Sequence, residues 1–238
     1  MAIKVPKTLI IVPAYNEEVS IASTLNSLIK LKRNIKSLEI CVVNDGSIDK
    51  TADIVASFDV VLLNLPMNLG IGGAVQTGYK YAYNHGYEIA VQFDADGQHN
   101  PNDFLELIKP IIKNEEDMVV GSRFLQKTSY RGSKTRRIGI YYFYLILKLL
   151  TNKSFTDPTS GYRAINRRVI RLFAHNYPKD YPEPEVLMHL NRKNMRIREV
   201  TANMAARQGG ESSITFWKSV YYMGKVTLSI LMQSIVKE

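Results

Sequence analysis

Short, almost continuous runs of apolar residues recur through the first half of the chain, and each run ends abruptly in polar residues. The runs occupy residues 8–13, 38–43, 60–63 and 89–93. Runs of this length without polar alternation are typical of parallel strands that are buried on both faces. The segments between them have helical spacing, as in Ile21, Leu25 and Leu28. The pattern therefore predicts βαβ units with right-handed crossovers, which bring the carboxyl ends of the strands to one sheet edge.

The second half of the chain alternates less strictly. Residues 138–150 form an almost wholly apolar stretch with four aromatic side chains, residues 196–204 have the pattern of a late strand, and residues 214–236 have that of a final helix. The final helix has only a narrow polar stripe, and an apolar arc that wide requires cover from protein or lipid. We therefore divide the chain into a domain at 1–212 and an amphipathic helix at 213–238 that associates with a membrane or a partner.

The predicted strand at 89–93 is followed by two acids one residue apart, Asp94 and Asp96. Residues i and i+2 of an extended chain point to the same side, so the two carboxylates repel each other unless a cation lies between them. Oxygen ligands suit a hard divalent ion, Mg²⁺ or Mn²⁺, which in turn binds phosphate oxygens. Gln98 adds a neutral oxygen and His99 a nitrogen within reach. A solvated turn is the alternative, because Asp-Gly sequences are common in turns.

The other predicted strands also end in polar residues, at 15–17, 44–45 and 68–73. Ligands of open parallel sheets bind along that edge, so the convergence favours a binding site there. For the second of these segments, helix capping is the alternative. The glycines of the third segment fail the spacing of a dinucleotide-binding fingerprint.

Charge and composition narrow the function classes. The 238 residues carry 31 basic and 22 acidic side chains, and the resulting net charge of +9 suits anionic partners such as phosphate-bearing substrates, anionic membranes or nucleic acid. The single cysteine, Cys41, gives no disulfide framework. No window of 18 uninterrupted apolar residues is present, and the N-terminus lacks the pattern of a signal peptide.

Residues 127–137 hold five basic residues and no acid, directly before the aromatic-rich stretch at 138–150. We interpret the two segments as a basic loop and an interfacial helix that meet anionic lipid. A buried core helix beside a solvated basic loop is the alternative.

Five motifs follow one another along the chain. They cover residues 12–18, 43–51, 68–74, 94–99 and 121–124. In content and order they resemble the glycosyltransferase family 2 enzymes of the GT-A fold, and within them the dolichyl- or polyprenyl-phosphate sugar transferases. The resemblance implies a Rossmann-like α/β fold, with a mostly parallel sheet and helices on both faces. It also implies metal-dependent, inverting transfer of a sugar from a UDP- or GDP-hexose to a polyprenyl phosphate.

The resemblance also assigns roles to residues of this chain. The expected ligands of the nucleotide-sugar are Pro13, Tyr15, Glu17, Asp45, Gly73, Asp94, Ala95 and Asp96. Mg²⁺ or Mn²⁺ is expected at Asp94, Asp96 and Gln98. The expected ligands of acceptor or donor phosphate are Arg123, Arg131, Arg136, Arg137, Arg207 and Ser212. The expected catalytic residues are Asp96, Arg123 and Glu185.

The chemistry of such a transfer agrees with these residue types. Negative charge develops on the departing nucleoside diphosphate, and a divalent ion together with arginines stabilises it. A phosphate monoester has a second pKa of about 6, so a polyprenyl phosphate is already anionic and needs orientation by arginine more than it needs a base. The alternative is a hydroxyl acceptor on a growing glycan, for which Glu185 or Asp96 would be the base. A basic nucleic-acid-binding protein is a further alternative, but the chain has no such motif, and we expect no nucleic-acid partner.

The resemblance also bears on location. Many members of the resembled group carry C-terminal transmembrane helices, and this sequence ends without them. We expect a cytoplasmic protein held peripherally at the inner face of the cell membrane by the helix at 214–236. A small integral-membrane partner or a second copy of the chain would reinforce this reversible attachment. Packing of the helix back onto the catalytic domain is the alternative.

Overall fold

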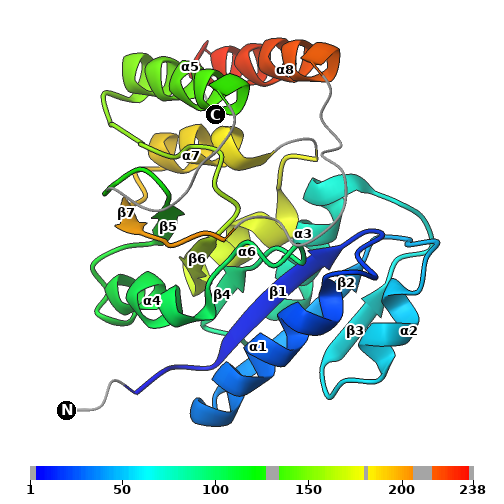
Figure 1. Cartoon of the computed structure of the whole chain (residues 1–238). Coiled ribbons are helices and arrows are strands. Elements are labelled where there is room, and N and C mark those ends of the chain that lie inside the picture. Colours follow the sequence, from blue (N-terminus) through cyan, green and yellow to red (C-terminus); the bar gives the residue numbers. More distant parts are fainter. Residues whose placement is uncertain (1–3, 127–133, 180–181, 206–215, 236–238) are drawn as a thin grey trace.

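A mixed sheet runs through the centre of the protein (Figure 1). The computed structural model describes residues 4–126, 134–179, 182–205 and 216–235, and within them the sheet has seven strands in the order β3-β2-β1-β4-β6-β5-β7. The strands are Thr8–Ala14 (β1), Leu38–Asn44 (β2), Val61–Asn64 (β3), Ile89–Gln92 (β4), Met118–Ser122 (β5), Arg163–Asn166 (β6) and Ile197–Thr201 (β7). The helices are Ile21–Asn34 (α1), Thr51–Ala56 (α2), Gly70–Asn84 (α3), Phe104–Ile112 (α4), Lys134–Thr151 (α5), Arg167–His175 (α6), Pro182–Arg192 (α7) and Phe216–Ile235 (α8).

The strand directions confirm the predicted mostly parallel sheet. β1 pairs in parallel with β2 and β4, β2 with β3, and β5 with β7, while β6 runs antiparallel to its neighbours β4 and β5. The chain builds outward from β1 to β3 on one side and then places β4 on the other side of β1. The carboxyl ends of β1 and β4 therefore meet at a topological switch point, which is where open α/β sheets bind ligands.

Alternate side chains of the strands enter two apolar layers, one on each face of the sheet. Leu9 and Ile11 of β1 belong to the layer that includes α3 and α6, whereas Ile10 and Val12 belong to the layer that includes α1 and α4. All four side chains are fully buried. Burial of such a side chain contributes about 1.5–3 kcal/mol. Because a shift of one residue would exchange the two layers, this packing fixes the register that positions the strand ends.

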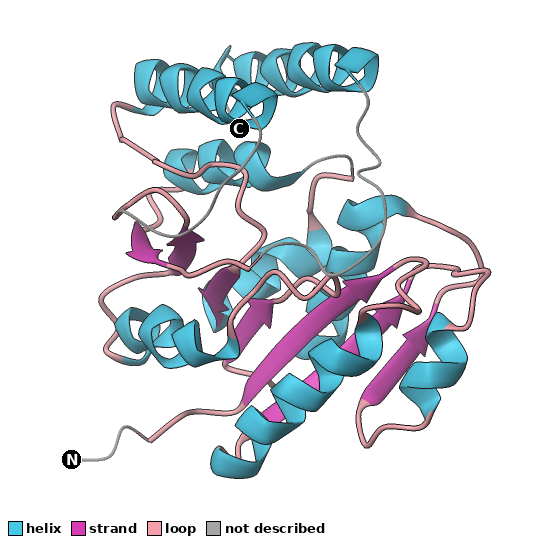
Figure 2. Ribbon diagram, in the orientation of Figure 1, coloured by secondary structure: helices cyan, strands magenta, loops and turns pink. Residues whose placement is uncertain are grey.

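A further layer of helices lies beyond α7, on the side away from the sheet (Figures 1 and 2). There α5 and α8 run side by side, and both contact α7. Val226 and Ile230 of α8 are fully buried in the same apolar layer as Ile11, while Leu228 and Met232 are 60% and 56% exposed. The final helix thus packs on the rest of the fold along one face and presents apolar side chains on another. No helix within the described residues is both long enough and apolar enough to cross a membrane.

Two strands of the described sheet, β5 and β6, were not predicted from the sequence. β6 has four residues, begins with Arg163, and lies between β4 and β5. β6 lacks the apolar run that marks β1, β2 and β4. The other predicted elements are present with shifted ends: the stretch at 138–150 lies in α5, and the late strand at 196–204 is the shorter β7.

Candidate active site

The turns after β1 and β2 are joined by hydrogen bonds between backbone and side chains. Asn16 has a left-handed backbone with a φ of 53°, its N–H donates to Ser47 Oγ at 3.0 Å, and its Oδ1 accepts the N–H of Ile48 at 3.0 Å. The N–H of Glu17 donates to Thr51 Oγ1 at 2.8 Å. A left-handed backbone at a residue other than glycine costs free energy that the surroundings must offset. These contacts do so, and they hold the two turns in one fixed geometry at the sheet edge.

Three of the predicted nucleotide-sugar ligands come from the end of β1 and the turn that follows. Pro13 lies in β1 opposite Val43 of β2. Tyr15 is 46% exposed at the sheet edge, so its ring is open to a ligand. The Oε2 atom of Glu17 accepts a hydrogen bond of 2.6 Å from the hydroxyl of Ser20. The structure therefore brings these residues to the edge that the sequence predicts, and their contact with a nucleotide-sugar stays a prediction.

Asp45, at the end of β2, acts as a cap for α3. Its Oδ1 accepts the N–H of Leu69 at 2.7 Å. Burial raises the pKa of the Asp45 carboxyl, and the hydrogen bonds from Leu69 and Gly70 offset part of this rise. The preceding Asn44 donates to Asn64 Oδ1 at 2.9 Å and so ties β2 to β3. Both residues thus make structural contacts within the protein, in line with the alternative to ligand binding that was considered for this segment. Nucleoside binding by Asp45 stays a prediction.

Close packing explains two glycines in the first turn of α3. A Cβ atom on Gly72 would lie 2.2 Å from the backbone oxygens of Pro178 and Lys179, and one on Gly73 would lie 2.5 Å from the Cβ of Leu69. The N–H of Gly72 also donates to the oxygen of Lys179 at 3.1 Å. Gly72 thus lets α3 pack against the segment that precedes α7, and Gly73 leaves room for the side chain of Leu69. A contact of Gly73 with the sugar nucleotide stays a prediction.

The loop after β4 carries both predicted metal-binding acids. Asp96 Oδ1 accepts the N–H of Gln98 at 3.0 Å, and the side chain of Asp94 is 34% exposed. Between the two acids, Ala95 is buried, and its carbonyl oxygen accepts a hydrogen bond of 3.0 Å from Thr24 Oγ1 of α1. The loop is thus anchored to α1 through the middle residue and leaves the flanking acids partly exposed.

The donor set of this loop fits a hard divalent cation. Asp94, Asp96 and Gln98 all offer side-chain oxygens from partly exposed positions. A Cβ atom on Gly161 would lie 3.0 Å from both carboxylate oxygens of Asp94, so the glycine leaves the room that this carboxylate needs. Over the described ranges, no group of three or more His, Cys, Asp or Glu side chains could hold a metal ion. The shell of Mg²⁺ or Mn²⁺ would therefore be completed by the amide oxygen, by water and by phosphate oxygens of the substrate.

Arg123, directly after β5, is held in a buried ion pair. Its Nε donates to Asp157 Oδ2 and its Nη2 to Asp157 Oδ1, both at 2.6 Å, and Nη2 also donates to Thr159 Oγ1 at 3.1 Å. Glu199 Oε1 accepts the backbone N–H of Asp157 at 2.8 Å, which secures the turn that carries this acid. A bidentate pair of this kind fixes the plane of the guanidinium group. Phosphate binding and a catalytic role of Arg123 stay predictions.

Glu185, near the start of α7, contacts the final helix. Its Oε2 accepts a hydrogen bond of 2.6 Å from Ser229 Oγ, and Gln233 Nε2 lies 3.5 Å from the same oxygen. The residue is only 9% exposed. These contacts give Glu185 a structural role that requires no chemistry, and its predicted catalytic role is not tested by them.

The predicted phosphate-binding residues of the basic loop are only partly described. Arg131, Arg207 and Ser212 lie outside the described residues, and the side chain of Arg136 is likewise not described. Arg137 is exposed in the first turn of α5.

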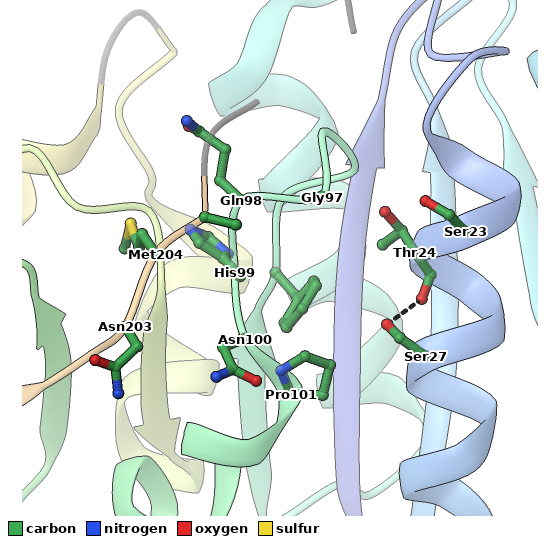
Figure 3. A pocket seen from close by; sticks show the side chains of 12 residues that line it. Ser23, Thr24, Ser27, Gly97, Gln98, His99, Asn100, Pro101, Asn203 and Met204 are labelled. Carbon is green, nitrogen blue, oxygen red and sulfur yellow. Dashed lines mark hydrogen bonds between the residues drawn. The ribbon is translucent and has the colours of Figure 1, made fainter. Parts of the chain in front are cut away.

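A cavity of about 390 Å³ lies on the α1 side of the loop after β4 (Figure 3). Its walls are partly polar and partly apolar and carry no Asp, Glu, Lys or Arg side chain. The polar lining residues are Ser23, Thr24, Ser27, Gln98, His99, Asn100 and Asn203. Figure 3 shows Gln98 extending away from the other labelled side chains. Asp94 and Asp96 do not line the cavity. The cavity therefore adjoins the acidic loop at Gln98, while the two acids themselves lie outside its lining.

Sequence reasoning missed two residues of the turn before β6 and misjudged a third residue. Asp157 clamps Arg123, and Gly161 lies against the Asp94 carboxylate. His99, which we considered as a nitrogen within reach of the metal, is instead buried, and burial lowers its pKa. The sequence could have marked this turn as a candidate part of the site, because it holds an acid and a glycine among polar residues. Its position beside the acidic loop is visible only in the structure, through the pairing of β6 with β4.

Comparisons with known proteins agree with this geometry. A mostly parallel sheet with paired acids after the strand beside β1 is the arrangement expected of a glycosyltransferase of the GT-A class. The model of the family described as Glycosyl transferase family 2 matches residues 9–173, and the chain belongs to this family. The match confirms the resemblance drawn from the five motifs, together with the predicted fold and enzyme class.

Individual relatives cover most of the chain. The UDP-N-acetylglucosamine–dolichyl-phosphate N-acetylglucosaminyltransferase of Methanococcus voltae is 33% identical over 211 residues, which are 80% of this chain and 82% of that protein. The undecaprenyl-phosphate mannosyltransferase of Micrococcus luteus is 30% identical over 218 residues, 88% of each chain. A crystal structure of glucosyl-3-phosphoglycerate synthase from Mycobacterium tuberculosis, in complex with Mn²⁺, UDP and phosphoglyceric acid, shares the fold. Its TM-score is 0.76 at 19% identity, with 98% of this chain and 80% of that chain covered.

Proposed function

We propose that the protein transfers a sugar from a nucleoside diphosphate sugar to a polyprenyl phosphate, with inversion at the anomeric carbon. The observation that carries the proposal is the pair Asp94 and Asp96, with Gln98, at the switch point beside β1. The lipid acceptor is supported by the two relatives, which are named for transfer to dolichyl and undecaprenyl phosphate. Their names differ in the sugar, so the proposal leaves the sugar open.

A divalent ion, when bound at Asp94, Asp96 and Gln98, would neutralise the negative charge of the departing diphosphate. The structural relative from Mycobacterium tuberculosis was crystallised with Mn²⁺ and UDP, which supports a divalent metal in this fold. The residues of the chain itself then have separate tasks. Tyr15 is exposed at the edge beside the end of β1, where its ring can stack on a base. The turn that carries Glu17 is fixed by Thr51.

Arg123 would bind a phosphate group of the donor or of the acceptor. Its orientation is set by Asp157 before any substrate binds, so little conformational entropy is lost when a phosphate approaches. The acceptor phosphate is already ionised near neutral pH, with a second pKa of about 6. It therefore requires orientation by cations and no side chain that removes a proton. Arg131, Arg136, Arg137 and Arg207, with Ser212, are the proposed acceptor ligands.

The outer face of α5 and α8 would lie on the membrane. On α5, Ile138, Tyr141, Leu145 and Leu149 recur at helical spacing and are exposed, Leu149 to 84%. On α8, Leu228 and Met232 are exposed in the same layer of helices (Figure 1). The basic segment at 127–137 extends into the first turn of α5, so its part at 134–137 is helical and not a loop as predicted. The net charge of +9 favours an anionic surface. We propose peripheral attachment at the inner face of the cell membrane, reinforced by an integral-membrane partner or a second copy of the chain.

The proposal is tested by turnover of a panel of UDP- and GDP-sugars with a short polyprenyl phosphate and Mg²⁺ or Mn²⁺. The expected result is formation of a sugar linked to the polyprenyl phosphate, and EDTA should abolish this reaction. Transfer to an oligosaccharide but not to the lipid phosphate would instead identify a hydroxyl-acceptor enzyme.

A further inference from the structure

We propose that His99 is the positioning residue of the metal site, and that its imidazole holds the Asp94 carboxylate in the orientation that binds the ion. The inference rests on the proposed function only in assigning the metal to Asp94, Asp96 and Gln98. It adds a residue that does not itself contact the metal or the substrate.

The imidazole of His99 contacts Asp94 with both ring nitrogens. Its Nδ1 accepts the backbone N–H of Asp94 at 3.0 Å, and its Nε2 lies 3.4 Å from Asp94 Oδ2. A neutral imidazole has one nitrogen that donates and one that accepts. Because Nδ1 accepts, the ring proton is on Nε2, the nitrogen nearer to the carboxylate. His99 therefore holds the main chain of Asp94 by a hydrogen bond and lies in contact with its side chain.

Packing against two aromatic rings fixes the plane of the imidazole. The imidazole stacks on Tyr162 with ring centroids 4.7 Å apart at an angle of 18°, and it meets Phe93 edge-on at 5.2 Å. The side chain of His99 is 2% exposed. The backbone of His99 also forms a β-bridge with Met204, which follows β7. The ring thus belongs to the apolar core, whereas Nδ1 binds the main chain of Asp94 and Nε2 lies beside its carboxylate.

Gly161 completes the seat of that carboxylate. A Cβ atom at this position would lie 3.0 Å from Oδ1 and from Oδ2 of Asp94. The carboxylate is thus bounded by His99 and by a residue that has no side chain. It remains 34% exposed and so reaches the site edge. Partners of this kind set the direction of a metal ligand, and their loss typically costs about 10- to 100-fold in metal affinity.

The test compares two substitutions that separate packing from hydrogen bonding. His99→Phe keeps an aromatic ring in the stack but removes both polar contacts with Asp94. His99→Gln loses the stack, yet its amide can accept the Asp94 N–H and donate to the carboxylate. Tyr162→Phe is the matched control, because it removes the hydroxyl that donates to Asn100 in the same loop and leaves the stacked ring.

Mn²⁺ binding is measured by calorimetry at saturating UDP, with folding checked by circular dichroism. We expect His99→Phe to weaken Mn²⁺ binding by about 10-fold or more, His99→Gln to recover most of that loss, and Tyr162→Phe to bind as the wild type does. A folded His99→Phe protein with wild-type affinity overturns the inference. Equal losses in the Phe and Gln variants overturn it too, because the polar contacts that Gln retains would then recover no affinity.

A measurement on the wild-type protein covers the case in which the Phe variant does not fold. Long-range ¹H–¹⁵N spectra report which nitrogen of His99 carries the proton. A proton on Nε2, whose resonance shifts when Mg²⁺ and UDP are added, supports the inference, and a proton on Nδ1 overturns it. Wild-type protein that binds no Mn²⁺ in the presence of UDP would refute the proposed metal site itself, while the tautomer would still report on the contact with Asp94.

Discussion

Ser229 of α8 donates a hydrogen bond of 2.6 Å to Glu185 of α7. The contact joins the final helix to a residue that the sequence suggested as a catalytic base. The acid is only 9% exposed, so its charge relies on partners within the protein. Glu185 therefore has a reason to be present whether or not it takes part in catalysis.

Glu185→Gln separates the two roles. A glutamine oxygen can still accept from Ser229, but it cannot remove a proton from an acceptor. If the acceptor is a phosphate, we expect turnover of polyprenyl phosphate to stay near the wild-type rate in a steady-state assay.

Ser229→Ala tests the structural role of the same contact. It should lower the free energy of unfolding, measured by urea titration, by about 1–3 kcal/mol, because it leaves a buried acceptor less well satisfied. A loss of turnover in Glu185→Gln at unchanged stability would instead support a base.

Asp96→Asn should lower turnover by about 100-fold or more, which is the scale of a lost charge-stabilising contact. The amide is similar in shape and can still accept the N–H of Gln98, a contact of 3.0 Å in the structure, so the fold should survive. Initial rates over a range of Mn²⁺ concentrations provide the measurement. Full activity of the wild-type enzyme in excess EDTA would rule out the metal requirement.

Asp157→Asn should destabilise the protein strongly. It removes the charge of the acid that pairs with the Arg123 guanidinium, which is 2% exposed, and breaking a buried pair on one side costs about 3–5 kcal/mol. The matched control is Glu106→Ala, which removes the exposed ion pair with Lys109 at 3.5 Å. That pair should contribute about 1 kcal/mol or less. Chemical denaturation of both variants is the measurement, and similar small effects would show that the buried pair is not important for folding.

Arg131, Arg136 and Arg137 are proposed to serve the acceptor phosphate or membrane lipid and not the donor. Replacing all three with Gln should raise the KM for polyprenyl phosphate and leave the affinity for the sugar nucleotide nearly unchanged. Calorimetry with the nucleotide and kinetics with the lipid measure the two effects separately. An equal loss of nucleotide affinity would contradict the assignment.

The sequence predicted the first half of the fold because single residues there carry strong local signals. An apolar run such as that of β1 predicts a buried strand without knowledge of its tertiary contacts. The polar residues after each run then mark the edge of the sheet where the site lies. Asp94 and Asp96 could be found this way because their spacing alone carries the chemistry. Their surroundings could not be found, since Gly161 meets Asp94 only through the pairing of β6 with β4.

The second half was harder to predict because its contacts join distant segments. Arg123 was expected to bind phosphate, yet its observed partner, Asp157, is 34 residues away in a turn without periodicity. His99 looked like a surface ligand from its polar neighbours. Its burial depends on Tyr162, whose ring arrives from the turn that precedes β6. In each case the residue type was informative and the partner was set by the topology.

The two faces of α8 give the last prediction, which concerns the membrane. Leu228 and Met232 are exposed, whereas Ile230 is fully buried in the core layer. Replacing Leu228 and Met232 together with Ser should weaken co-flotation with anionic vesicles and leave thermal unfolding nearly unchanged, because these side chains contact little protein. Ile230→Ala is the opposing control, and it should lower the free energy of unfolding by about 2–5 kcal/mol without reducing vesicle binding of the folded fraction. If the outer-face variant floats as well as the wild type does, the exposed face of α8 does not attach the protein to lipid. A partner protein or a second copy would then be the occupant to seek, by measuring the mass of the assembly with the same two variants.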